Sequence, residues 1–421
     1  MERSTFLTGL VLVALIALAL AGLTWANYQF AEYNPGGNDF IPRWVGVRLL
    51  LTEGQDPYSV ETTLAIQEAM YGRAAAPGED QALFAYPLYS SLIFAPFAAV
   101  GEYSLARALW MTLLEISLLA TVLLAMQLSD WKPDRLILIG LLLFAIAWYH
   151  GARPLINGNA AILVALFFVA GLWFLREKQD GAAGLLFALS TIKPQMVLLA
   201  VPYALIWAIS RRRYRLVVSF LVALAAMLGF SFWLQPNWLG ENIAQVLAYS
   251  SYTPPGTLAS ILASWWPAQG DLAGWGLSVF LAGLLLFEWW VSLGKDFYWL
   301  LWTFSLTLVL TNLVGIPTTT ANYASMLLVI PLVLSAWSRR LGPEKRWLVW
   351  LALALLFLGL WLLFWVTLLP TQQYNEHLVM FLPVPLLLLF NLYWLRDWML
   401  QPAELNYPAK RAQQKNRDAN Q

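Results

Sequence analysis

The chain has 421 residues, of which 60% are apolar and only 12% are charged, whereas soluble globular proteins average about 45–50% and about 25%. This composition excludes a soluble enzyme and a disordered chain, and it indicates a membrane protein with one polytopic domain over residues 1–400. Cysteine is absent, which excludes disulfides, thiolate catalysis and thiolate metal sites. The net charge of +1 gives no sign of nucleic-acid binding.

Apolar stretches of about 20 residues can cross a bilayer as helices, because lipid offers no partners to free backbone polar groups. The sequence contains about twelve such stretches, so an all-α fold is predicted. The first is too long for the core of a signal peptide and is interpreted as a retained anchor. In chain order the stretches are 6–26, 81–101, 103–128, 136–152, 154–175, 181–210, 216–240, 272–294, 297–338 (long enough for two), 347–375 and 377–395.

Lysine and arginine in short loops set the orientation of a membrane protein, because they favour the cytoplasmic side. Clusters at 211–215, 339–346 and 410–417 fall on the same side as the N-terminus if the chain crosses twelve times. Both termini, including a polar tail at 401–421, are therefore predicted to be cytoplasmic. The interval 27–85 then lies outside the cell membrane, and its eight acids and three bases fit that side.

The first outer loop holds the residue predicted to be catalytic. Residues 34–40 are polar and follow the first span directly, so Asp39 is expected at the membrane boundary. Asp39 has two compatible interpretations: a general base acting on a sugar hydroxyl, or a cap for a short interfacial helix over 41–52. On that helix, Arg43 and Arg48 can reach either lipid headgroups or a substrate phosphate.

Three further features of the chain have a structural and a functional interpretation. Asp56 is expected in a turn, and Tyr58 is expected as an interfacial aromatic residue. Arg153 forms a polar cluster with two nearby asparagines between spans, on a side that the span count leaves open. Lys193 lies inside an apolar stretch, where charge is expensive. It is interpreted as a phosphate ligand, as a partner of Glu115 or Glu288, or as a residue snorkelling to an interface.

Several segments, in this order and spacing, resemble glycosyltransferase family 87. In the first outer loop they are Asn38-Asp39, Gly54-Gln55-Asp56-Pro57-Tyr58 and Tyr86-Pro87. Further on they are Leu155-Ile156-Asn157-Gly158-Asn159 and the segment 184–194, which ends in Lys193-Pro194. The resemblance covers the first half of the chain well. It implies the multi-spanning type C glycosyltransferase fold, found in polyprenyl-phosphate-mannose-dependent mannosyltransferases of bacterial envelope glycolipid assembly.

The resemblance also implies roles for residues. An acid of the first outer loop is the catalytic base in that fold, which corresponds to Asp39. Lys193 corresponds to a ligand of the donor phosphate. The family often has a late histidine where this chain has residues 317–323, so Asn322 or Tyr323 is expected to replace it. The residues predicted to bind donor or acceptor are Asn38, Arg43, Arg48, Asp56, Tyr58, Tyr86, Arg153, Asn157, Asn159, Lys193, Asn322 and Tyr323.

The predicted function is transfer of a sugar, by resemblance mannose, from a polyprenyl-monophosphate donor to a lipid or glycan hydroxyl outside the cytoplasm. No acidic pair has magnesium-site spacing, so neither a metal nor another cofactor is predicted. A second outer segment, 235–271, contains a candidate lid at 250–256. Two alternatives remain: a transporter or lipid flippase, which would have inverted repeats with paired broken helices, and an inactive membrane scaffold.

Overall fold

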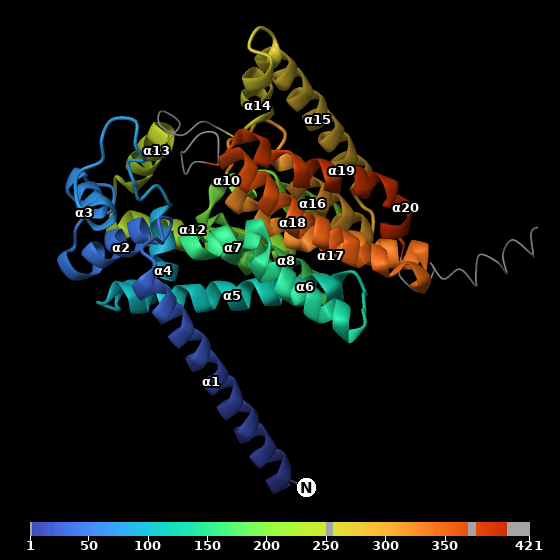
Figure 1. Cartoon of the computed structure of the whole chain (residues 1–421), viewed down its shortest axis with the longest axis horizontal. Helices are drawn as coiled ribbons and strands as arrows, with labels where there is room; N and C mark the ends of the chain where they lie inside the picture. The colour runs from blue at the N-terminus through green and yellow to red at the C-terminus, as the bar shows by residue number, and fades with distance from the viewer. Residues whose placement is uncertain (1, 250–255, 369–375, 402–421) are drawn as a thin grey trace, which may run out of the picture. The chain divides into compact units, whose positions relative to one another are not determined.

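The computed structural model describes residues 2–249, 256–368 and 376–401 (Figure 1). These residues form helices and turns, with no strand among them, as the composition predicted. The candidate lid lies outside the described residues except for Gly256, and so does the tail except for Gln401. The chain divides into two compact units, each of which is built from several segments.

Unit 1 comprises residues 1–117, 154–160 and 230–252. Its helices carry the segment that contains Asp39 and the elements that follow it. They are α1 (Glu2–Tyr33), α2 (Ile41–Glu53), α3 (Val60–Tyr71), η1 (Leu88–Ser90), α4 (Ser91–Ala98), the first part of α5 (Tyr103–Leu128) and α13 (Trp238–Tyr249).

Unit 2 comprises residues 118–153, 161–229 and 253–421. Its first helices, after the end of α5, are α6 (Arg135–Ala147), α7 (Tyr149–Asn157), α8 (Ala161–Arg176), α9 (Asp180–Leu189), η2 (Ser190–Ile192), α10 (Pro194–Val197), α11 (Ala200–Ser210) and α12 (Tyr214–Leu234). The last residues of α7 and of α12, from 154 and from 230, belong to unit 1. The others are α14 (Leu258–Trp265), α15 (Gly270–Ser292), α16 (Phe297–Thr311), η3 (Thr320–Ser325), α17 (Met326–Leu341), η4 (Pro343–Lys345), α18 (Trp347–Leu368), η5 (Leu378–Phe381), α19 (Pro383–Trp394) and α20 (Arg396–Met399).

Within the described ranges, six helices are long and apolar enough to cross a membrane, and the bent pair α6–α7, with a 47° angle, makes seven if it is one span. The other five of the twelve predicted stretches hold only shorter apolar helices. The stretch 81–101, for example, contains an apolar helical segment of only eleven residues, Leu88–Ala98. Full-length helices thus account for about half of the predicted crossings.

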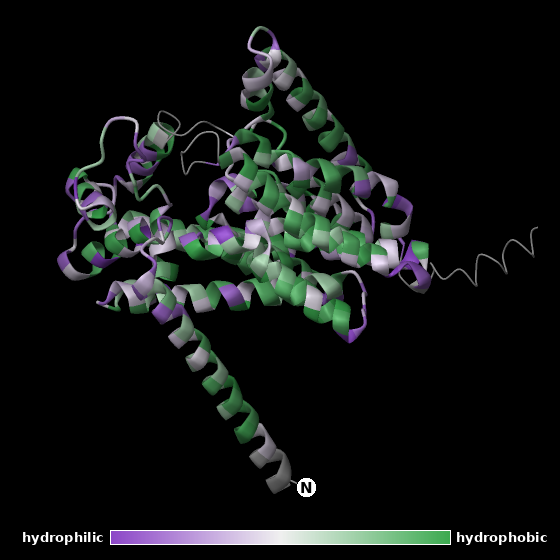
Figure 2. Cartoon of the chain, viewed as in Figure 1, coloured by the Kyte–Doolittle hydropathy of each residue, from purple (hydrophilic) through white to green (hydrophobic). Residues whose placement is uncertain are grey.

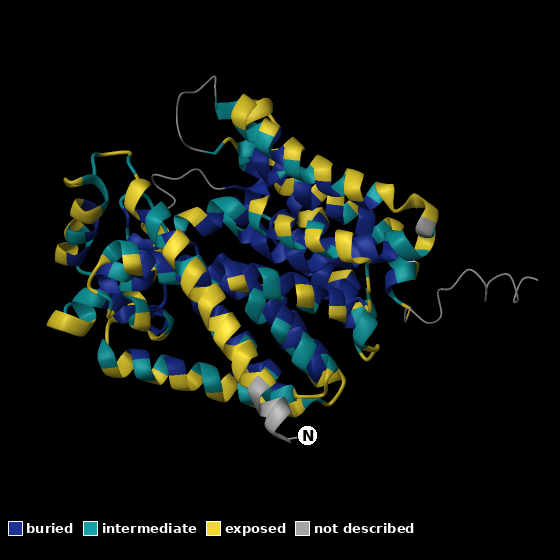
Figure 3. Cartoon of the chain, turned by 60° about the horizontal axis from the view of Figure 1, so that its bottom comes forward, coloured by how far each residue is buried: buried dark blue, intermediate teal, exposed yellow. Residues whose placement is uncertain are grey.

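The helix α1 shows why this chain needs lipid around it. Apolar residues run along most of its length (Figure 2), and most of them are exposed (Figure 3). Leu12 and Val13, for example, retain 58% and 65% of their surface. A long helix with exposed apolar side chains is stable in a bilayer, where its backbone is satisfied internally. The predicted first span is confirmed as such a helix.

Two long apolar stretches are interrupted, 181–210 at Lys193 and 297–338 after Thr311, and the division of 297–338 into two was predicted. Lys193 is the N-cap of α10, and Pro194 occupies the first turn of that helix. Proline has no N–H and clashes with the preceding turn, so it starts a helix more readily than it continues one. The long stretch 297–338 is divided between α16, which ends at Thr311, and η3, which begins at Thr320.

Candidate active site

Asp39 lies in the turn that joins α1 to α2 in unit 1. Its main-chain N–H donates to the carbonyl of Asn157 at 3.0 Å, but no residue in the described parts of the chain donates a hydrogen bond to its carboxylate. The N-cap of α2 is Phe40, and no side chain caps the helix there, although Pro42 lies in its first turn. The expectation that Asp39 caps this helix is therefore wrong, and its carboxylate is left for another role.

Glycine and two residues of α5 hold the chain just before Asp39. Tyr103 donates its hydroxyl to the carbonyl of Gly36 at 2.8 Å, and Arg107 donates to the carbonyl of Asn34 at 2.7 Å. Gly37 has φ +84°, and a Cβ there would lie 2.3 Å from the Tyr103 hydroxyl. Only glycine fits this approach, which explains the glycine pair in the sequence.

A second segment of unit 1, residues 156–158, packs against the same turn. Arg107 donates to the carbonyl of Ile156 at 3.1 Å, and the indole of Trp110 donates to the carbonyl of Gly158 at 2.8 Å. Gly158 has φ +71°, and a Cβ on it would lie 2.6 Å from the Cβ of Phe40. The ring of Phe40 stacks on Trp110 with centroids 5.7 Å apart. The Asp39 backbone is thus fixed by packing on both sides.

The predicted asparagines enter this arrangement in different ways. Asn157 contributes its backbone carbonyl to Asp39, while Asn159 is buried at 5% exposure. Asn38, next to Asp39, is exposed. The structure therefore brings Asn157 to the predicted base, as main chain rather than as a side-chain ligand.

Arg43 and Asp80 share the electrostatic surroundings of Asp39. Arg43 is 8% exposed, its guanidinium lies 4.0 Å from the ring centre of Tyr86, and its Nε has no hydrogen-bond partner within the described ranges. Asp80 keeps solvent access, but partial burial raises the pKa of its carboxyl, and the charge of Asp39 raises it further. The charge of Arg43 acts in the opposite direction. Sequence reasoning missed Asp80, because it lies far from Asp39 along the chain.

Three other predicted residues of the loop have structural roles. The carboxylate of Asp56 accepts a hydrogen bond from the main-chain N–H of Tyr58 at 2.9 Å, which confirms the predicted turn. Tyr58 is buried rather than interfacial, and its hydroxyl donates to the carbonyl of Tyr86 at 2.6 Å. Arg48 donates to the carbonyl of Ala98 at the end of α4, at 3.1 Å.

A polar cluster in unit 2 contains Arg153 and a carboxylate that the sequence did not single out. The guanidinium of Arg153 lies 3.6 Å from the carboxylate of Glu376, and it also contacts the Tyr149 hydroxyl. Thr320 donates its hydroxyl to Glu376. Burial raises the pKa of Glu376, while Arg153 and the two hydroxyls act to lower it. In the sequence, Glu376 is a single acid after an apolar stretch, and nothing near it along the chain indicates that it joins Arg153.

The two residues expected to replace a late histidine are both buried. The amide nitrogen of Asn322 donates to the Thr318 hydroxyl at 2.8 Å, and its oxygen has no partner among the residues described. Tyr323 donates its hydroxyl to the carbonyl of Phe381 at 2.7 Å, so that hydroxyl is engaged in the fold. Asn322 thus keeps a free acceptor, whereas Tyr323 is a packing residue.

Lys193 is 3% exposed in unit 2. The carboxylates suggested as its structural partners have other contacts. Glu288 is paired with Arg396 at 2.7 Å, and Glu115 of unit 1 accepts from Asn27 at 2.8 Å. Glu288 is also buried, at 2% exposure.

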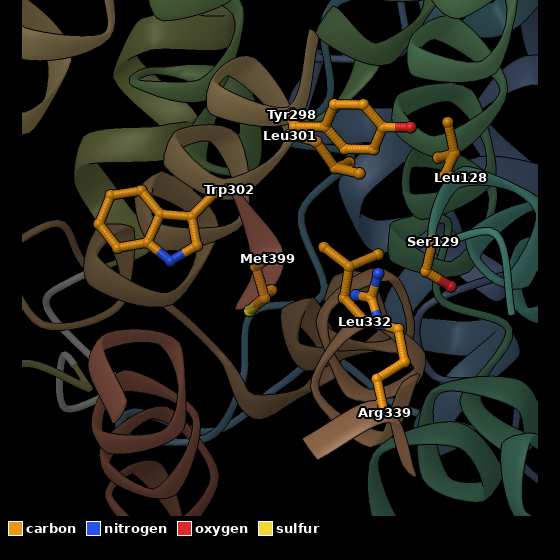
Figure 4. A pocket seen from close by; sticks show the side chains of 8 residues that line it. All are labelled: Leu128, Ser129, Tyr298, Leu301, Trp302, Leu332, Arg339 and Met399. Atoms are coloured by element: carbon orange, nitrogen blue, oxygen red, sulfur yellow. The ribbon is translucent and has the colours of Figure 1, made fainter. Parts of the chain in front are cut away.

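Metal ligands and cavities were sought elsewhere in the described parts of the chain. The described residues contain no group of three His, Cys, Asp or Glu side chains that could hold a metal ion. A small cavity in unit 2, lined by residues that include Tyr298, Trp302 and Arg339, contains none of the predicted site residues (Figure 4).

Comparison with known proteins identifies the family. Residues 84–317 match the model of glycosyltransferase family 87, which is 234 of the 421 residues. The chain therefore belongs to this family and is a multi-pass membrane glycosyltransferase. No curated protein and no solved structure matches it. The matched region contains Arg153 and Lys193, whereas the turn of Asp39 precedes it.

Proposed function

We propose that this glycosyltransferase moves a sugar, by resemblance mannose, from a polyprenyl monophosphate to a hydroxyl of an envelope lipid or glycan. The reaction takes place on the extracytoplasmic side of a type C fold that crosses the cell membrane twelve times, with both termini in the cytoplasm. A lipid-linked donor fits this location, since nucleotide sugars are cytoplasmic. It also fits the described part of the chain, where no soluble nucleotide-binding domain is found.

Asp39 acts as the general base. It removes the proton of the acceptor hydroxyl while that oxygen attacks the anomeric carbon. The bond from this carbon to the phosphate oxygen breaks, and the polyprenyl phosphate leaves with the electron pair. One direct displacement inverts the anomeric centre. The observation that carries this assignment is the Asp39 carboxylate, which accepts no hydrogen bond from the described residues although its backbone is fixed on both sides.

Arg43 stabilises charge on the leaving phosphate. Its guanidinium is held over the ring of Tyr86, and its buried Nε is free of partners in the described ranges. A fixed positive charge in a site shielded from water stabilises a developing anion more strongly than one in bulk solvent. Lys193 serves as a second phosphate ligand, as the family resemblance implies. Arg48 is assigned a weaker part, because it already binds a backbone carbonyl.

The test compares sugar transfer by wild type and by Asp39→Asn in membranes supplied with polyprenyl-phosphate mannose and a lipid extract as acceptor. General-base catalysis contributes about 100-fold to 10,000-fold, so a loss of that size is expected. Glu53→Gln is the matched control, because Glu53 is an exposed acid at the end of the adjacent helix. Its activity is expected to equal that of wild type.

Other outcomes separate the alternatives. Undiminished transfer by a well-expressed Asp39→Asn variant would keep the enzyme class and remove the proposed base. If wild type transferred no sugar from any polyprenyl-phosphate donor in a panel, the assigned donor class would be wrong. Movement of a lipid across the bilayer would then be measured as the competing function.

A further inference from the structure

A carboxylate in unit 2 occupies a position surrounded by hydrogen-bond donors. The groups around Glu376 are the guanidinium of Arg153 and the hydroxyls of Thr320 and Tyr149. Arg153 and Tyr149 come from α7, and Thr320 begins η3. The carboxylate side chain is 13% exposed. Arginine and hydroxyl donors of this kind bind phosphate as well as they bind carboxylate, since both anions present paired oxygens.

His150 adds a second, independent observation at this cluster. It is 1% exposed, and neither of its ring nitrogens has a hydrogen-bond partner in the described part of the chain. The ring lies edge-on to Tyr323, with centroids 4.9 Å apart. Arg153 is close enough to act on it electrostatically, and the backbone of Thr320 lies beside its ring. His150 is therefore a buried residue and not an interfacial one.

The segment formed by η3 and the residue before it holds two more buried polar atoms that have no partner in the described ranges. They are the Thr319 hydroxyl oxygen and the amide oxygen of Asn322. Native proteins leave few buried polar atoms unsatisfied, so a group of them calls for an explanation. A polar ligand that binds among these residues supplies one, since it would satisfy several atoms at once.

We propose that Arg153, Thr320 and His150 form the binding site for the phosphate of the lipid donor, and that Glu376 holds this position when no donor is bound. The proposal deepens the proposed function and rests on it for the identity of the donor. The guanidinium and the Thr320 hydroxyl bind phosphate oxygens, and one ring N–H of His150 provides a further donor. Glu376 is then a carboxylate that competes with the substrate.

The charges around Glu376 predict how this residue affects phosphate binding. A polyprenyl-phosphate sugar is a phosphodiester with one negative charge. If it bound beside an ionised Glu376, two negative charges would face one guanidinium in a site with little solvent. An uncompensated buried charge is costly, so Glu376 must move away or take up a proton. Burial raises the pKa of Glu376, which makes proton uptake accessible. Removing this charge should therefore strengthen phosphate binding.

The experiment measures binding directly. Full-length protein in nanodiscs of zwitterionic lipid is titrated with farnesyl phosphate, a short polyprenyl monophosphate, and with farnesol, the same chain without phosphate. Glu376→Gln is expected to lower the Kd for farnesyl phosphate about fivefold, and Arg153→Gln to raise it about tenfold. His150→Phe keeps the ring packed on Tyr323 and is expected to raise the Kd about threefold. Farnesol binding is expected to change in none of them.

Glu288→Gln is the matched control. Glu288 is also a buried carboxylate of unit 2 held by an arginine and a tyrosine, Arg396 at 2.7 Å and Tyr393 at 3.3 Å. Its variant should leave the Kd for farnesyl phosphate unchanged. Equal changes in the Glu376 and Glu288 variants would refute the proposal, and so would an unchanged Kd in Arg153→Gln. If Glu376→Gln fails to fold, Thr320→Val provides the test, with a raised Kd expected and an unchanged one contradicting the site.

Two experimental outcomes distinguish a wrong phosphate site from a wrong function. Suppose that sugar transfer depends on Asp39, but the Kd for farnesyl phosphate is unchanged in the Arg153 and Glu376 variants. The proposed function would then be supported and the phosphate site refuted. The expected Kd shifts in a protein that transfers no sugar from any polyprenyl-phosphate donor would support the phosphate site and refute the transfer.

Discussion

The fixed backbone around Asp39 predicts a large effect from a substitution that touches no catalytic group, Gly158→Ala. Gly158 has φ +71°, where an alanine is strained by about 1–2 kcal/mol. The new Cβ would lie 2.6 Å from the Cβ of Phe40, and relieving that overlap costs about 1–3 kcal/mol more. A total loss of about 2–5 kcal/mol in the free energy of unfolding is expected.

The overlap would also move the proposed base. Phe40 follows Asp39 directly and is packed against Trp110, so it can yield only by shifting the turn. A displacement of about 1 Å can lower a rate about 100-fold, because a reacting pair must meet in a narrow range of geometries. Gly158→Ala is therefore expected to lose both stability and kcat, although residue 158 itself touches no substrate.

Gly54→Ala is the matched control for this prediction. Gly54 caps α2 with φ +68°, close to the value at Gly158, but nothing lies within 4 Å of its added Cβ. Only the backbone strain of about 1–2 kcal/mol applies, and activity should persist. The assay compares Tm in detergent and kcat in sugar transfer for both variants. If the two variants lost equal stability and equal activity, the claim that close packing of residues 40 and 158 positions the base would be refuted.

Two further predictions concern acids of unit 1. Burial and the charge of Asp56 raise the pKa of Glu241, so its ionised form destabilises the fold increasingly as pH rises from the ordinary to the raised value. Glu241→Gln should therefore raise Tm at pH 8 but not at pH 4, and an equal gain at both would contradict this. Asp80→Asn removes a negative charge near Asp39, so the acid limb of the pH–rate profile should move to lower pH. An unmoved limb would show that Asp80 does not act on the base.

The sequence predicted the features that depend on local composition. Apolar stretches without charge identify membrane helices, because a backbone in lipid must satisfy its own hydrogen bonds. The same local logic located the turn at Asp56, since aspartate acts on neighbouring backbone groups. The family resemblance rests on short motifs and is likewise visible along the chain, and the family match confirmed it.

Span length was harder to predict. Hydropathy does not report where a helix ends inside an apolar stretch, so the stretch 81–101 was interpreted as a full span although its helical segment has eleven residues. This segment packs inside the protein, where the ring of Phe94 in α4 contacts Phe40 and Trp110. A residue that packs in three dimensions looks the same in the sequence as one that faces lipid.

The sequence by itself determined the class of protein and its apolar helices, and it predicted Asp39 as the base. What only the tertiary structure decided is which side chains accompany these groups. Asp80 near Asp39, and Glu376 against Arg153, join segments far apart along the chain. Burial and charge at such positions depend on distances across the fold, and no local pattern encodes those distances. His150 is the clearest case, since its burial, with no hydrogen-bond partner among the residues described, follows from helices packing around it.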